Sequence, residues 1–178
     1  MSIEKIKKLE DLKAEEKKIF EQRNKLFDKQ RPDAINALLN EMAVYLKDNG
    51  FSNAFVHEED QRSFTSSYGE ILITVTSSKD SESFLGADYQ INISSGKKSA
   101  SISLSLNRGD RVQSPHEGNL DAKIHDYETR YLPALRALDI KQLDGSYSLT
   151  FNSMLLKTPK SIPNGRTGMD MFFDLLSN

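Results

Sequence analysis

The histidines of the chain are the first residues whose types suggest chemistry, and His57 and His125 each have several carboxylates nearby in the sequence. His57 is followed by the acidic run Glu-Glu-Asp at 58–60, and His125 is followed by Asp126 with Glu128 nearby. Imidazole and carboxylate groups bind metals and carry protons. Their spacing, however, matches neither a His-Glu-x-x-His helix nor another paired-ligand pattern. We therefore predict no metal site and no cofactor, and keep an enzyme with a site near His125 as a second alternative.

Serine offers a different chemistry, as a nucleophile. That role requires a positioned base and an oxyanion hole, and no serine here lies in a Gly-x-Ser-x-Gly elbow. Ser99, Ser101, Ser103 and Ser105 instead alternate with apolar residues, which is typical of an antiparallel strand with one wet side. We assign no catalytic residue. The serine side is either plain solvated surface or a flat polar docking face.

Lys157, Lys160 and Arg166 lie in a loop rich in proline and glycine, residues 157–168. Such cations contact phosphates or acidic partners, although the Gly-Arg-Thr-Gly stretch at 165–168 lacks the Lys-Ser/Thr ending of a P-loop. Residues 1–31 add ten Lys or Arg against seven Asp or Glu, a net charge of +3. The first alternative function is therefore a nucleic-acid-associated factor that uses the basic N-terminal helix and this loop.

The N-terminal segment is predicted to form a long charged helix, because residues 3–29 contain neither glycine nor proline. Leu12, Ile19 and Leu26 recur every seven residues, and Phe20 and Phe27 form an adjoining stripe. Charged residues interrupt the heptad. The stripe still needs cover, either from a partner protein, from a second copy in a coiled coil, or from the chain's own domain. We predict these five residues as a partner-binding surface.

Downstream of this helix, Arg31-Pro32 indicates a break, followed by a second helix that ends at Asn49-Gly50. Period-two alternation then predicts strands, and two further helices follow. Pro133 predicts a kink or split in the first of these. The expected fold is α+β, an antiparallel sheet of four to five strands with helices covering one face, preceded by the long helix. The expected elements are strands near 53–57, 64–75, 89–94, 99–106 and 147–155, and helices over 120–138 and 169–176.

Composition sets the remaining bounds on the class of protein. The chain of 178 residues has 37% hydrophobic residues, no cysteine and a formal net charge of -2. Disulfides and thiolate metal sites are excluded, and the apolar runs fall far short of the ~20 residues that span a bilayer. We expect a cytoplasmic protein that does not enter a membrane. We divide it into an assembly or packing arm, residues 1–30, and an α+β globular domain, residues 31–178.

These observations favour a non-enzymatic protein-interaction module, namely an adaptor, an inhibitor or a chaperone-like component. It would assemble through its N-terminal helix, while the sheet face or the loops engage a protein target. The sequence does not identify the partner, the oligomeric state or the biological process.

Overall fold

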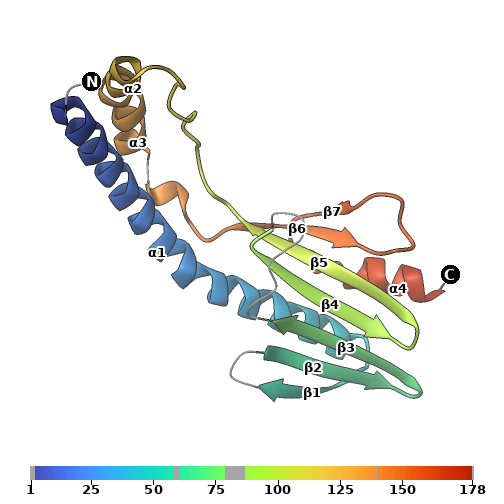
Figure 1. Cartoon of the computed structure of the whole chain (residues 1–178). Helices are drawn as coiled ribbons and strands as arrows, with labels where there is room; N and C mark the ends of the chain where they lie inside the picture. Colours follow the sequence, from blue (N-terminus) through green and yellow to red (C-terminus); the bar gives the residue numbers. More distant parts are fainter. Residues whose placement is uncertain (1–2, 58–60, 79–86, 139, 178) are drawn as a thin grey trace. The chain divides into compact units, whose positions relative to one another are not determined.

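The computed structural model of the chain describes residues 3–57, 61–78, 87–138 and 140–177. One long helix comes first, followed by five strands, a helical segment, two more strands and a terminal helix (Figure 1). The helices are α1 (Ile3–Asp48), α2 (Leu120–Asp126), the π-helix η1 (Tyr127–Tyr131), α3 (Leu132–Ala137), the 3-10 helix η2 (Ile140–Gln142) and α4 (Met169–Ser177). The strands are β1 (Ser52–His57), β2 (Gln61–Tyr68), β3 (Ile71–Ser78), β4 (Tyr89–Ser95), β5 (Lys98–Leu106), β6 (Tyr147–Asn152) and β7 (Lys160–Ile162).

The chain forms two compact units. The first consists of Met1–Gln30 with Asn107–Asp144, and the second consists of Arg31–Leu106 with Gly145–Asn178. Helix α1 contributes its first part to one unit and its second part to the other. Whether the predicted division into residues 1–30 and 31–178 describes parts that fold independently stays a prediction.

Helix α1 continues through Pro32, so the predicted break at Arg31-Pro32 is wrong. Proline inside a helix removes one backbone hydrogen bond and costs roughly 3 kcal/mol. Pro32 is exposed, and its ring therefore displaces no core side chain. Both flanks favour a helix, because the residues before Pro32 have high helix propensity and the residues after it bury an apolar face. Local breaking signals are overridden when both neighbours gain from continuing the helix.

The second unit contains a fully antiparallel sheet in which the strands lie in chain order, β1 to β7. The α+β class and the antiparallel sheet are confirmed, but the sheet has seven strands where we expected four to five. Gly69, with φ at +58°, turns the expected long strand 64–75 into the hairpin of β2 and β3. The other unexpected strand is β7, a three-residue strand within the loop that we expected to be irregular.

The second part of α1 and helix α4 lie along one face of this sheet (Figure 1). The second part of α1 buries seven apolar residues, and α4 buries Met169, Phe172 and Leu175. Tyr45 of α1 and Phe173 of α4 lie with ring centroids 6.2 Å apart, so the two helices are neighbours. Each fully buried large side chain contributes roughly 1.5–3 kcal/mol. The buried residues are Ala34, Ile35, Leu38, Leu39, Met42, Ala43 and Leu46 in α1, and Phe64, Ile73, Val75, Ile91, Ile93, Ile102, Leu104, Leu149, Phe151 and Ile162 in the sheet.

The first unit has a small core of its own, in which the leading part of α1 packs against residues 120–138. The helix predicted there is present and is divided as Pro133 suggested, into α2, the π-helix η1 and α3. The Leu132 N–H, directly before Pro133, bonds back to the Tyr127 carbonyl, five residues earlier, which is the π-helical pattern. The core consists of Leu9, Ile124, Tyr127, Tyr131, Leu132 and Leu135.

Candidate binding face

The side of the sheet that faces away from the helices carries short polar side chains in rows that cross the strands. Ser63, Thr76, Asn92, Ser101 and Asn152 lie opposite one another in succession from β2 to β6. Successive side chains of a strand point to opposite faces, so these residues share the side away from the helices. We call this side the open face. Two further rows of the open face are Thr65, Thr74, Ser94 and Ser99, and Gln90, Ser103, Thr150 and Ser161.

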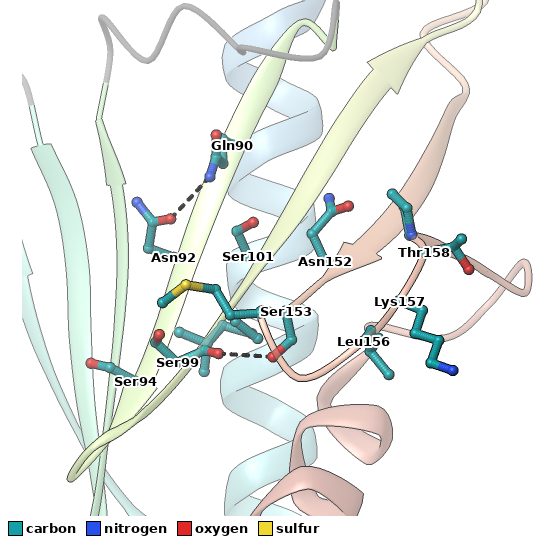
Figure 2. Close-up of a pocket in the computed structure, with 14 residues that line it drawn as sticks. Gln90, Asn92, Ser94, Ser99, Ser101, Asn152, Ser153, Leu156, Lys157 and Thr158 are labelled. Atoms are coloured by element: carbon teal, nitrogen blue, oxygen red, sulfur yellow. Dashed lines mark hydrogen bonds between the residues drawn. The ribbon is translucent and has the colours of Figure 1, made fainter.

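A hollow of about 480 Å³ lies on the open face, between strands β4 to β6 and the loop that follows β6 (Figure 2). In Figure 2 the polar side chains stand on the near side of the strands, and helix α1 passes behind them. The loop residues Met154 and Leu155 are 96% and 65% exposed. The hollow is lined by Gln90, Asn92, Ile93, Ser94, Ser99, Ala100, Ser101, Asn152, Ser153, Met154, Leu156, Lys157, Thr158 and Pro159.

Hydrogen bonds fix part of this lining. Gln90 Nε2 donates to Asn92 Oδ1 at 3.2 Å, and Asn152 Nδ2 donates to Ser103 Oγ at 3.2 Å. Ser153 Oγ donates to the Ser99 carbonyl at 3.2 Å, which ties the loop to β5. These bonds orient the amide groups.

Among the residues that the structure describes, the lining includes hydroxyl, amide and ammonium groups but neither a carboxylate nor an imidazole. General acid–base catalysis at neutral pH relies chiefly on carboxylate and imidazole groups. The described lining of the hollow can therefore position a ligand through hydrogen bonds from hydroxyl, amide and ammonium groups.

We call residues 1–30 the leader. Most of the five leader residues that were predicted to bind a partner are buried or partly buried within the first unit. Leu12 and Ile19 are partly buried against the core of that unit, and Leu26 is also partly buried. Phe27 is 6% exposed, and the Arg108 guanidinium carbon lies 5.3 Å from its ring centroid. Phe20 alone among the five is classed as exposed, at 40%. Their predicted role in binding a partner stays a prediction.

Polar contacts also hold the leader to residues 120–138. Tyr127 Oη donates to Glu16 Oε2 and Tyr131 Oη donates to Glu16 Oε1, both at 2.7 Å. Burial is the main cause, and the hydrogen bond to Glu16 the second, of a pKa of Tyr127 raised to about 12. The same two causes raise the pKa of Tyr131. Arg136 forms a two-point contact with Glu15 at 2.7 and 2.9 Å.

The three cations of the 157–168 region do not form one site. Lys157 lines the hollow of the open face, while Lys160 lies exposed in β7, opposite Phe151. Arg166 Nη1 forms an ion pair with Asp170 Oδ2 at 3.0 Å. A second hollow, of about 640 Å³, has Arg166 among its lining residues together with Glu41, Asp48 and Asp170. Its carboxylates disfavour a phosphate there.

The two carboxylates near His125 are both paired with cations. Arg130 donates two hydrogen bonds to the Asp126 carboxylate, from Nε to Oδ1 at 2.7 Å and from Nη2 to Oδ2 at 2.6 Å. These bonds, with a further one from the His116 backbone N–H, lower the pKa of Asp126 to about 2. Glu128 pairs with Lys8 at 2.8 Å. The side chain of His57 and the run 58–60 lie outside the described part, and the residues that are described contain no cluster of potential metal ligands.

Sequence reasoning found part of the open face and missed the hollow. The serine alternation from Ser99 to Ser105 marked one strand of it. Gln90, Asn92 and Asn152 were not singled out, because only the strand register places them beside those serines. The alternation of Asn92 with Ile91 and Ile93 was the available signal.

Searches against protein-family models, curated proteins and solved structures find no match. Within the described residues, every helix is too short or too polar to span a bilayer.

Proposed function

We propose that the chain is a non-enzymatic protein-interaction module, and that its partner docks on the open face over the hollow. The observation that carries this proposal is the continuous neutral row from Ser63 to Asn152. Short hydroxyl and amide side chains lose little rotamer freedom on docking, and they donate and accept hydrogen bonds. Met154, which lines the hollow, and its neighbour Leu155 are exposed apolar side chains that a docked partner would bury, and buried anchors supply most of the binding energy of an interface.

This surface is favoured over the leader, because most of the leader stripe already packs inside the first unit. It is also favoured over a nucleic-acid surface. Four of the leader's lysines lie within 4.0 Å of carboxylates, namely Lys5, Lys8, Lys13 and Lys17. Neutralised cations release fewer counterions from a nucleic acid. The open face itself is uncharged along its central row.

The test is to purify a partner with the full-length chain from the native host and to measure its affinity for matched variants. Ser101→Arg places a long cation in the hollow, and we expect at least about tenfold weaker binding, equivalent to about 1.4 kcal/mol. Phe20→Ser removes the exposed leader ring and should leave affinity unchanged. Loss of binding with Phe20→Ser and retention with Ser101→Arg would assign the partner to the leader instead. Circular dichroism verifies that both variants are folded.

A further inference from the structure

The second hollow, of about 640 Å³, lies within the second unit, beside the second part of α1 and the turn that leads into α4. Its volume falls within the range of ligand-binding pockets, ~300–1,000 Å³. The function proposed above involves the open face, whereas this hollow lies on the helical side of the sheet. It is lined by Asn40, Glu41, Val44, Tyr45, Asp48, Gly165, Arg166, Thr167 and Asp170.

The lining residues from α1 include a stripe along one side of the helix. Residues at positions i, i+3, i+4 and i+7 of a helix lie one above the other. The stripe has this spacing and consists of Glu41, Val44, Tyr45 and Asp48. At 1.5 Å per residue, the positions of Glu41 and Asp48 are about 10 Å apart along the helix axis. The hollow therefore presents an acidic side chain at each end of an apolar centre.

The apolar centre of the stripe is accessible and already ordered. Val44 is 56% exposed. Tyr45 is partly buried, and its ring packs against Phe173 of α4 with ring centroids 6.2 Å apart. Because this contact orders the Tyr45 ring in advance, less conformational entropy is lost when a ligand packs beside it. An apolar group of a ligand can displace water from Val44, and a cation can lie against the tyrosine ring.

Carboxylates outnumber cations in the described lining of the second hollow. Three carboxylates, from Glu41, Asp48 and Asp170, are present with one guanidinium group, that of Arg166. Arg166 is already paired with Asp170 at 3.0 Å. Among the residues that the structure describes, no ion pair reaches the carboxylate of Glu41 or Asp48. The net charge of this lining favours a cationic ligand, and the two ends of the stripe are where its charges would pair.

The pKa of the tyrosine in this stripe is consistent with these acidic surroundings. Burial is the first cause of the raised pKa of Tyr45, and the carboxylates of Asp170 and Asp174 are the next. Its neighbours thus disfavour a negative charge on the Tyr45 hydroxyl, and they disfavour an anionic ligand beside it for the same reason.

We propose that the second hollow binds a basic segment of a partner protein, in which an apolar residue is flanked on both sides by lysine or arginine. The apolar side chain rests on Val44 beside the Tyr45 ring, and the flanking cations pair with Glu41 and Asp48. Lysine and arginine combine a long apolar stem with a charged head, so they pack in such a hollow and reach its acidic ends. An apolar segment without cations would cover two carboxylates that have no counter-charge, which costs free energy.

This inference goes beyond the function proposed above and does not rest on it. The open face and the second hollow lie on opposite sides of the sheet. Ser101→Arg should therefore leave binding at the second hollow unchanged, and Glu41→Gln should leave the affinity of the open face for its partner unchanged. Failure of one proposal leaves the other standing.

The probe is a set of short peptides enriched from a displayed random library on the full-length chain, after depletion on the double variant Glu41→Gln/Asp48→Asn. Both substitutions keep the size of an exposed side chain and remove only its charge, so the fold should be retained, and the melting temperature verifies this. We expect the enriched peptides to carry lysine or arginine on both sides of an apolar residue.

Fluorescence anisotropy then measures the affinity of one enriched peptide for matched variants. Two exposed ion pairs together are worth about tenfold, so the double variant should bind about tenfold more weakly than wild type. Val44→Ser removes the apolar contact and should also weaken binding. The control Asp33→Asn neutralises an exposed carboxylate of α1 outside the hollow and should leave the affinity unchanged.

Two further measurements distinguish other occupants of the second hollow. The proposal is overturned if spermidine binds as tightly as the peptide, because a free polyamine would then be the ligand. It is also overturned if light scattering shows a dimer of the free chain that the double variant abolishes, because a second copy would then fill the hollow. Enriched peptides without basic residues, or equal affinity for wild type and the double variant, would overturn it as well.

Discussion

At the scale of single residues, Glu16 has the most demanding position in the first unit. It interrupts the apolar stripe of the leader, yet its two carboxylate oxygens accept hydrogen bonds from Tyr127 and Tyr131. The two rings also meet edge to face, with centroids 5.3 Å apart. Glu16, which breaks the apolar heptad pattern, therefore accepts hydrogen bonds from two tyrosines that lie more than a hundred residues away in the sequence.

Replacing Glu16 by alanine should destabilise the first unit, because two largely buried hydroxyl groups lose their acceptor. An unsatisfied buried donor costs roughly 1–3 kcal/mol. Urea denaturation followed by circular dichroism measures the loss. The matched control is Glu15→Ala, which removes the partner of the exposed Arg136 and should cost much less. Equal losses in the two variants would contradict a special role for Glu16.

The raised pKa of Tyr127 gives a dependence on alkaline pH. Its pKa of about 12 lies above the ordinary 10.0, so the folded state holds this proton more tightly than the unfolded state does. The associated stability is fully present below pH 10 and is lost as pH rises from 10 toward 12. Tyrosinate absorbance is the readout. Near pH 11 the Tyr127 hydroxyl of the folded protein should still be largely protonated, so Tyr127→Phe should leave the tyrosinate absorbance nearly unchanged. A clear decrease in this absorbance would show that Tyr127 has an ordinary pKa.

At the scale of elements, the turn before α4 places glycine where both backbone and space require it. Gly168 has φ at +77°, and a Cβ there would lie 2.6 Å from Ile162 Cδ1 and 3.1 Å from Ile102 Cδ1. Gly165 has nearly the same φ, +76°, with open space around it. Comparing alanine substitutions at these two glycines separates the cost of the left-handed backbone conformation from the cost of steric overlap between the new Cβ and its neighbours.

Gly168→Ala should therefore destabilise the protein more than Gly165→Ala. The left-handed conformation costs an alanine roughly 1–2 kcal/mol at either position, and overpacking adds roughly 1–3 kcal/mol at Gly168. Thermal unfolding of the two variants gives the comparison. Equal shifts in melting temperature would mean that Ile162 moves aside at no cost.

Elements with a strong period were predictable from sequence, and the exceptions have local causes. Ser99 to Leu106 alternate so regularly that β5 could be placed to within a residue. Gly69 was passed over because alternation continues on both sides of it, and β7 was missed because three residues between prolines carry no period. The hollow was beyond reach, since its lining joins β4, β5 and β6 through a register that only the folded sheet defines.

At the scale of the whole molecule, the first unit is built from two distant stretches of chain. Leu9 from the leader packs with Ile124 and Tyr127 from the later segment. The apolar stripe of the leader could be recognised in the sequence. The residues that pack against it, within 120–138, could not, because about a hundred residues separate the two segments and no short-range pattern links them. The expected arm, residues 1–30, is thus the partner in packing of residues 120–138.

Deleting residues 1–30 should consequently uncover the apolar side of residues 120–138. We expect fast hydrogen exchange at the backbone amides of this segment, because a short isolated helical segment is marginal in water. The amides of β3 to β5 should stay protected, since their core belongs to the second unit. Unchanged protection in 120–138 would show that the helical segment is stable without the leader.

The order of strands in the sheet also sets the order in which it can form during synthesis. Each strand pairs with the one before it in the chain, so β1 to β5 can join as the ribosome releases them, and short loops close quickly. Only β6 must wait for a long intervening stretch. Because β7 is the short strand between Pro159 and Pro163, strand pairing that starts at β1 proceeds toward a protected edge of the sheet.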